Sequence, residues 1–142
     1  MGAVKQFTCV AIGGRAVLID GPPGSGKSSL ALALIDRGAV LVGDDGVSLD
    51  LIGGRLKASP PPNTAGLIEV RNVGLVRMAT AARIPVALIV RLDGEAPRYI
   101  EAAEMIEVGG AALPMVRLWP DTPVLALRAE MALTAYGIGS GG

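Results

Sequence analysis

The stretch GPPGSGKS, residues 21–28, decides the fold that this sequence predicts. It matches the Walker A pattern G-x-x-x-x-G-K-[S/T], a P-loop whose glycines let backbone N–H groups approach phosphate oxygens. Apolar residues 16–19 precede the loop as an expected strand. Residues 28–37 follow it with helical spacing, and Gly38 is the expected C-terminal cap. This order predicts a nucleotide-binding α/β protein.

The loop residues have distinct chemical tasks. Lys27 supplies a positive charge to the β- and γ-phosphates, and the Ser28 hydroxyl is an expected ligand of Mg²⁺. The alternative is a glycine- and proline-rich turn that holds a lysine by chance, but the flanking strand and helix favour the phosphate loop. The nucleotide-binding residues predicted here are Gly21, Pro22, Pro23, Gly24, Ser25, Gly26, Lys27, Ser28 and Ser29.

Length and composition fit a single domain over residues 1–142, with residues 136–142 expected as a flexible tail. Hydrophobic residues make up 51% of the chain and aromatic residues 3%, so Ala, Val, Leu and Ile must build the core. Thirteen basic and thirteen acidic residues balance, which predicts no binding to nucleic acid or membrane. The lone Cys9 is expected as a buried small hydrophobe. No signal peptide or long apolar run is present, which predicts a cytoplasmic protein.

Glycine pairs predict two β-hairpins, because both turn positions can adopt positive φ. Gly13-Gly14 and Gly53-Gly54 each separate two strand-like runs. The expected strands are residues 7–12, 15–19, 39–42, 48–52, 55–57, 67–71 and 85–90. A helical turn is expected at 101–106 and a closing helix at 124–136. The predicted fold is α/β: a P-loop-containing mixed sheet with added β-hairpins and few helices.

Acidic residues at the ends of expected strands are candidates for catalysis. Asp44 and Asp45 are expected near the loop, because ligands bind at the carboxyl ends of strands in open α/β sheets. One carboxylate can accept a hydroxyl proton while the other meets Mg²⁺, and an ordinary turn is the alternative. Asp93 is another candidate magnesium ligand or turn residue. Glu69 and Arg71 share a strand face, either as a cross-strand ion pair or as a metal ligand with a phosphate-binding partner.

Three segments in this order resemble the catalytic domain of HPr kinase/phosphorylase, in a short form without a separate N-terminal domain. They are GPPGSGKSSLALALIDRG from residue 21, LVGDDGVSL from residue 41 and LIEVRNVGLV from residue 67. The resemblance implies transfer of phosphate from ATP, with Mg²⁺, to a serine of HPr, the phosphocarrier protein of the sugar phosphotransferase system. It also implies the reverse phosphorolysis, which yields pyrophosphate, and assembly into a hexamer.

The resemblance also implies roles for the residues that match the family motifs. Asp44 corresponds to the acid/base, and Asp45 to its neighbour near the metal. The metal ligands that the resemblance implies are Ser28, Asp45 and Glu69. It also implies that Arg71 lines the phosphates. Lys27 is also an expected catalytic residue, because its positive charge acts on the phosphates.

Two features depart from the family pattern. Gln6 stands where the family commonly has a histidine near the catalytic acid, and the chain contains no histidine, so the sequence leaves the phosphorolysis direction open. Residues 123–132 do not match the family's late Arg-Asn segment, so Arg128 receives no role. Two other functions stay open: a small-molecule kinase or nucleotide hydrolase with Asp93 as its magnesium ligand, and a non-catalytic nucleotide-binding regulator.

Overall fold

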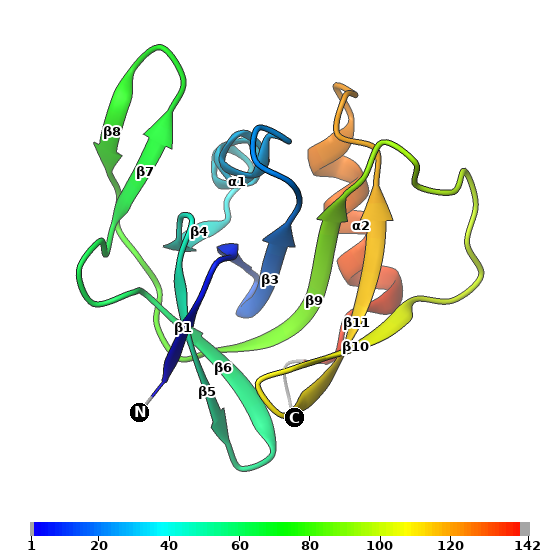
Figure 1. Ribbon diagram of the computed structural model, residues 1–142, viewed down its shortest axis with the longest axis horizontal. Coiled ribbons are helices and arrows are strands. Elements are labelled where there is room, and N and C mark those ends of the chain that lie inside the picture. Colours follow the sequence, from blue (N-terminus) through cyan, green and yellow to red (C-terminus); the bar gives the residue numbers. More distant parts are fainter. Residues whose placement is uncertain (1, 140–142) are drawn as a thin grey trace.

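Residues 2–139 are described in a computed structural model, in which a curled sheet of nine strands forms the centre (Figure 1). The strand order is β1-β5-β6-β9-β3-β2-β4, with β11 also on β9 and β10 on β11, while β7 and β8 form a separate hairpin. The strands are β1 (Ala3–Lys5), β2 (Thr8–Ile12), β3 (Arg15–Asp20), β4 (Val40–Gly43), β5 (Val47–Ile52), β6 (Arg55–Ser59), β7 (Leu67–Val70), β8 (Gly74–Arg77), β9 (Ile84–Leu92), β10 (Glu104–Val108) and β11 (Ala111–Leu118). The described helices are α1 (Lys27–Asp36) and α2 (Leu125–Tyr136).

The long strand β9 explains why the sheet curls. Its first residues pair antiparallel with β6, whereas its later residues pair in parallel with both β3 and β11. Figure 1 shows β9 bending from one half of the sheet into the other. Residues 86–90 are buried, as expected for a central strand covered on both faces. The prediction of a mixed sheet with added hairpins and few helices is therefore confirmed.

The two faces of the sheet bury separate apolar clusters. One cluster joins both helices to the sheet and contains Leu34 of α1 and Leu133 of α2. The other contains Leu49 and Leu56, from the β5–β6 hairpin that covers the opposite face. Cys9 lies in this second cluster, where burial raises the pKa of its thiol. Cys9 is therefore the buried small hydrophobe that the sequence predicts.

Glycine pairs close three antiparallel hairpins. Gly13 and Gly14 have φ values of 56° and 82°, in the left-handed region that glycine enters without a steric penalty. They join β2 to β3, and Gly53-Gly54 joins β5 to β6, so both predicted hairpins are confirmed. Gly109-Gly110 closes a third hairpin between β10 and β11. The helical turn expected at 101–106 is wrong, because residues 104–108 pair with β11 as a strand.

The closing helix is confirmed, and residues 136–139 make hydrogen bonds to other parts of the chain. Tyr136 ends α2, and its hydroxyl donates a hydrogen bond to the carbonyl of Ile100. The Ile138 N–H donates to the carbonyl of Ala87 at 3.0 Å, and the Gly139 carbonyl accepts from Arg55 at 2.9 Å. Residues 140–142 of the predicted tail lie outside the described residues.

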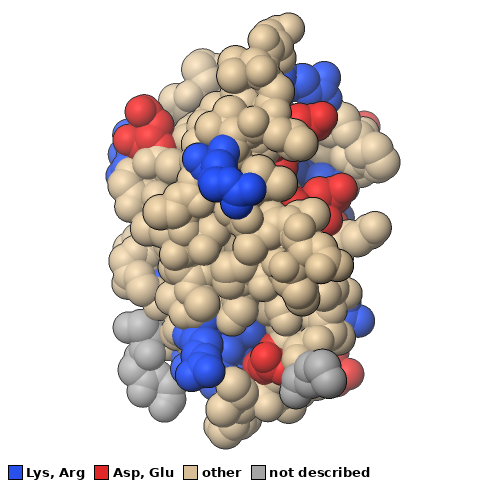
Figure 2. Space-filling view, turned by 90° about the vertical axis from the view of Figure 1, so that its left-hand side faces the viewer, with Lys and Arg blue, Asp and Glu red and all other residues tan. Residues whose placement is uncertain are grey.

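The surface shows how the balanced charges are distributed. The face in Figure 2 carries basic and acidic side chains near one another among wide uncharged areas. Within residues 2–139, no helix has the length and apolar character needed to cross a bilayer.

Candidate active site

The predicted phosphate loop connects the end of β3 to the start of α1. Gly24 and Gly26 have φ values of 78° and 97°, and the space around each is open on the side where a Cβ would stand. At Gly21, a Cβ would lie 2.6 Å from Ser25 Oγ and 3.3 Å from the Leu92 carbonyl oxygen, so a side chain there would require its neighbours to shift. The Lys27 ammonium reaches back across the loop and donates to the Gly21 carbonyl at 3.1 Å. The loop thus offers open backbone and a fixed positive charge at the start of a helix, as anion binding requires.

A cavity of about 770 Å³ opens in front of this loop. Its walls bring together residues from four distant segments: the start of β2, the loop, the end of β4 and the region of the β7–β8 hairpin. Pro22 and Ser25 do not line it, and both line a neighbouring cavity of about 320 Å³. The other predicted site residues all line the large cavity: Gly21, Pro23, Gly24, Gly26, Lys27, Ser28, Ser29, Asp44, Asp45, Glu69 and Arg71.

Asp44 is fixed by three hydrogen bonds from different parts of the chain. Its Oδ1 accepts from the hydroxyls of Ser28 at 2.6 Å and Thr8 at 3.1 Å. Its Oδ2 accepts from the backbone N–H of Glu69 at 3.0 Å. Both oxygens are therefore engaged, and the carboxylate is held against the hydroxyl expected to bind Mg²⁺.

Asp45 is the less constrained carboxylate of the pair. Its φ of 54° turns the chain sharply after Asp44, and its own N–H donates to the Thr8 hydroxyl at 3.2 Å. The side chain is exposed and lines the large cavity. Two adjacent aspartates thus lie in different environments, one fixed by hydrogen bonds and one open to a substrate.

Thr8 is a site residue that the sequence analysis missed. It is 1% exposed, and its hydroxyl donates to Asp44 and accepts from Asp45. Its contacts depend on the pairing of β2 with β4, which brings together residues 36 positions apart. The sequence feature that could have indicated Thr8 is its hydroxyl, which stands alone among the apolar residues of the first predicted strand. Gln6 also lines the cavity, just before β2.

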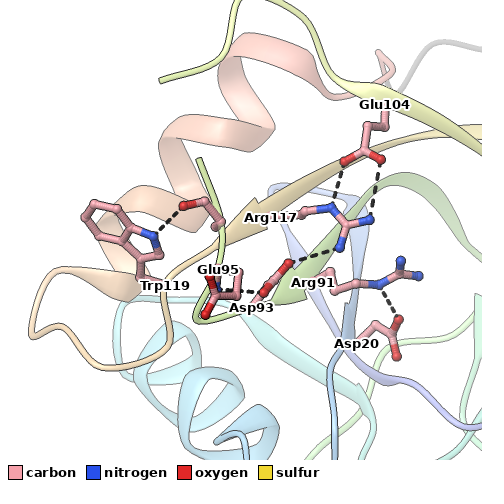
Figure 3. A network of polar contacts seen from close by, with 8 residues as sticks. Asp20, Arg91, Asp93, Glu95, Glu104, Arg117 and Trp119 are labelled. Atoms are coloured by element: carbon pink, nitrogen blue, oxygen red, sulfur yellow. Dashed lines mark hydrogen bonds and ion pairs between the residues drawn. The ribbon is translucent and has the colours of Figure 1, made fainter. Parts of the chain in front are cut away.

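Beside the loop, alternating charges cross the carboxyl ends of three parallel strands (Figure 3). Asp20 of β3 accepts from Arg91 of β9 at 2.8 Å. Arg117 of β11 binds Asp93 at 3.0 Å and Glu104 of β10 at 2.8 Å. Asp20 lines the large cavity, whereas Asp93 does not and lines the smaller one. Asp93 is therefore engaged with Arg117 away from the predicted magnesium site.

The pKa values of this charge network predict an acid-sensitive contribution to stability. The backbone N–H of Glu95 and the Arg117 guanidinium lower the pKa of Asp93, and Arg117 lowers the pKa of Glu104. A lowered pKa in the folded state stabilises the protein above the unfolded pKa, about 4, and this contribution is lost as the pH falls. We expect Arg117→Met to have a lower Tm than the unmodified protein at pH 7, with the difference shrinking below pH 4.

Thermal unfolding between pH 2.5 and 8 measures this effect, with Arg98→Met as the control at an exposed arginine. A Tm difference for Arg117→Met that stays constant across this range would show that lost packing, rather than the paired charges, causes it.

The residues at the end of the cavity near Asp44 fit a magnesium ion that is shared with a nucleotide. Mg²⁺ prefers oxygen ligands and commonly combines one or two carboxylates with substrate phosphates. Ser28, Asp45 and Glu69 present oxygen-bearing side chains to the same cavity. Among residues 2–139, no group of three or more His, Cys, Asp or Glu side chains is arranged to hold a metal alone. This donor set suits an ion that arrives with phosphate.

Comparison with known proteins connects this geometry to a family. The HPr Serine kinase C-terminal domain family matches residues 4–83, which include the loop, both aspartates and the β7–β8 hairpin. The chain belongs to this family. A solved structure of the HPr(Ser) kinase/phosphatase from Coxiella burnetii superposes with a TM-score of 0.78 at 26% identity, covering 91% of this chain and 86% of that one.

Curated relatives in the HPr kinase family are longer than this chain. The HPr kinase/phosphorylase of Cupriavidus necator is 37% identical over 121 residues, which cover 74% of this chain and 36% of that protein. The HPr kinase/phosphorylase of Clostridium tetani is 48% identical over 63 residues, 44% of this chain and 21% of that protein. The chain thus spans about a third or less of the curated relatives it matches.

Proposed function

We propose that this chain is a kinase that transfers phosphate from ATP to a serine of an HPr-type phosphocarrier protein. The observation that carries the proposal is the contact between Asp44 and Ser28 at 2.6 Å on the wall of the large cavity. It joins the predicted phosphate loop to the aspartate pair, so that a bound phosphate and a carboxylate base share one space. Phosphoryl transfer needs mainly such positioning and charge stabilisation.

The geometry favours exchanging the roles that the resemblance implies for Asp44 and Asp45. A general base needs a carboxylate oxygen that is free to reach the substrate hydroxyl. Asp44 already accepts three hydrogen bonds, whereas the Asp45 carboxylate is exposed to the cavity. We therefore assign Asp45 to accept the serine proton, and Asp44 to orient Ser28 beside the metal.

The remaining residues of the cavity would bind the nucleotide and Mg²⁺. The loop amides and Lys27 would hold the β- and γ-phosphates, and Arg71 would add a second positive charge. Ser28 and Glu69 would hold Mg²⁺, which neutralises phosphate charge when it is bound. During transfer, the serine oxygen forms a bond to the γ-phosphorus, the bond to ADP breaks, and the serine proton moves to Asp45.

The reverse reaction uses the same groups. Inorganic phosphate would attack phosphoserine, pyrophosphate would form, and Asp45 would return its proton to the serine oxygen. Gln6 lines this cavity but does not titrate, so the aspartates provide the acid/base chemistry. The cytoplasmic location and the hexamer stay predictions from sequence and resemblance.

Incubation of the purified chain with γ-labelled ATP, Mg²⁺ and a purified HPr protein tests the proposal. We expect labelled phosphoserine on HPr, and no label when its acceptor serine is replaced with alanine. Nucleotide binding without any phosphoserine would instead support the non-catalytic regulator. The small-molecule kinase that uses Asp93 is disfavoured, because Asp93 is paired with Arg117 outside the large cavity.

A further inference from the structure

A second cavity, of about 460 Å³, lies beside the phosphate loop. It is enclosed by the start of α1 on one side and by residues 120–126, which lead into α2, on the other. Four residues line both this cavity and the large one: Gly24, Gly26, Ser29 and Arg71. The two cavities are therefore neighbours that meet at the loop.

The walls of the second cavity have the chemistry of a nucleoside site. Leu30 and Ala33 of α1 face it together with Leu125 and Ala126, and two prolines within residues 120–126 add rigid apolar surface. Small-molecule sites typically combine such apolar walls with a few polar groups in a volume of about 300–1,000 Å³. Here the polar side chains are those of Ser25, Asp121 and Thr122 and of the shared residues Ser29 and Arg71.

The wall formed by residues 120–126 is held in place from both ends. On the side before it, the Trp119 indole N–H donates to the carbonyl of Ala96 at 2.7 Å (Figure 3). The Arg128 guanidinium lies 5.7 Å from the centre of the Trp119 ring, in the range of a cation–π contact. Within the segment, the Val124 N–H donates to the Thr122 hydroxyl at 3.3 Å. These contacts tie residues 120–126 to the segment around Ala96 and to α2.

The smaller cavity on the other side of the loop is a poorer match for a purine. Its volume is about 320 Å³, and the charged residues Arg91, Arg117, Asp20 and Asp93 line it together with the apolar Pro22, Leu92 and Pro120. The four charged side chains are already paired with one another. An apolar ring placed there would separate these groups from water without replacing their interactions. The loop therefore offers one side suited to a base and one side occupied by an ion-pair network.

From these observations, we infer that the second cavity binds the base and ribose of the nucleotide whose phosphates occupy the large cavity. This inference rests on the proposed function. Arg71, at the junction, has a planar guanidinium that can contact phosphate and also stack on a base. Asp121 is the carboxylate that accepts hydrogen bonds from the ribose hydroxyls.

Photolabelling with 8-azido-ATP tests where the base lies, because the reactive group is on the purine ring. Trypsin separates the two walls of the second cavity into peptides 28–37 and 118–128. We expect label in peptide 118–128, with or without label in 28–37, and loss of the label when excess ATP competes. Label confined to peptides that do not line the second cavity, such as 38–55 with Asp44 and Asp45 of the large cavity, would overturn the inference.

Filling the cavity provides an independent test. Ala33 is exposed and lines the second cavity, so Ala33→Trp should narrow it without disturbing the core. Ala126→Trp narrows the cavity from the other wall, and because Ala126 also packs against the core, circular dichroism checks that this variant keeps its helices. We expect each variant to weaken Mg·ATP binding about tenfold or more while Mg·tripolyphosphate binding, which lacks a nucleoside, changes by less than about twofold. Ala135→Trp, at an exposed site of α2 outside the cavity, is the matched control.

Calorimetric titration with both ligands separates this inference from the proposed function. An ATP-specific change of either sign in the cavity variants, absent in Ala135→Trp, supports the nucleoside site. Equal affinities of ATP and tripolyphosphate in the unmodified protein and in both cavity variants would overturn the inference but leave the phosphate site intact. Failure of the unmodified protein to bind either ligand would overturn both.

Discussion

Asp45→Asn should retain ATP binding and lose phosphoryl transfer by a factor of about 10²–10⁴, the usual contribution of a general base. The amide keeps the size of the carboxylate but cannot accept the serine proton. Because the proposed phosphate and Mg²⁺ contacts are made by the loop, Lys27, Ser28 and Glu69, nucleotide affinity should change little. Single-turnover transfer to HPr and calorimetric titration with Mg·ATP measure the two quantities separately.

Asp44→Asn is the informative comparison, because Asp44 is proposed to act through Ser28. Removing its charge should weaken the orientation of Ser28 and raise the Mg²⁺ concentration needed for half-maximal transfer. Asp93→Asn should leave transfer nearly unchanged, since Asp93 lies outside the large cavity. If Asp44→Asn lost transfer with normal Mg²⁺ dependence while Asp45→Asn stayed active, Asp44 would be the base, as the resemblance implies. A dominant effect of Asp93→Asn would support the small-molecule kinase.

Lys27→Ala should weaken ATP binding about 100-fold or more, because it removes the charge that the loop presents to the phosphates. The fold should persist, since the Lys27 ammonium donates a hydrogen bond to the Gly21 carbonyl within its own loop and not to a distant element. Titration with Mg·ATP measures the loss, and circular dichroism checks that the helices remain.

Lys57→Ala is the matched control, since Lys57 lies on β6 and does not line the cavity. Equal ATP affinities for Lys27→Ala and Lys57→Ala would refute the assignment of residues 21–28 as the phosphate site.

Much of the fold was predictable because its signals are local. A pair of glycines defines a tight hairpin wherever it separates two strand-like runs, and Gly13-Gly14 and Gly53-Gly54 did so. The β10–β11 hairpin was missed although Gly109-Gly110 carries the same signal. Its first strand, residues 104–108, has two glutamates among apolar residues, a pattern that a short helix shares. Pairing with β11 decided the outcome.

The sequence alone predicted the phosphate loop and the aspartate pair and identified the family, because each of these signals lies in residues that are close together in the chain. Tertiary structure alone decided how the two aspartates differ: Asp44 meets Thr8 and Ser28 only because β2, α1 and β4 converge from positions up to 36 residues apart. It also decided that residues 120–126 form a wall opposite α1. Such contacts depend on strand register and helix packing over long separations, which no local pattern of residues specifies.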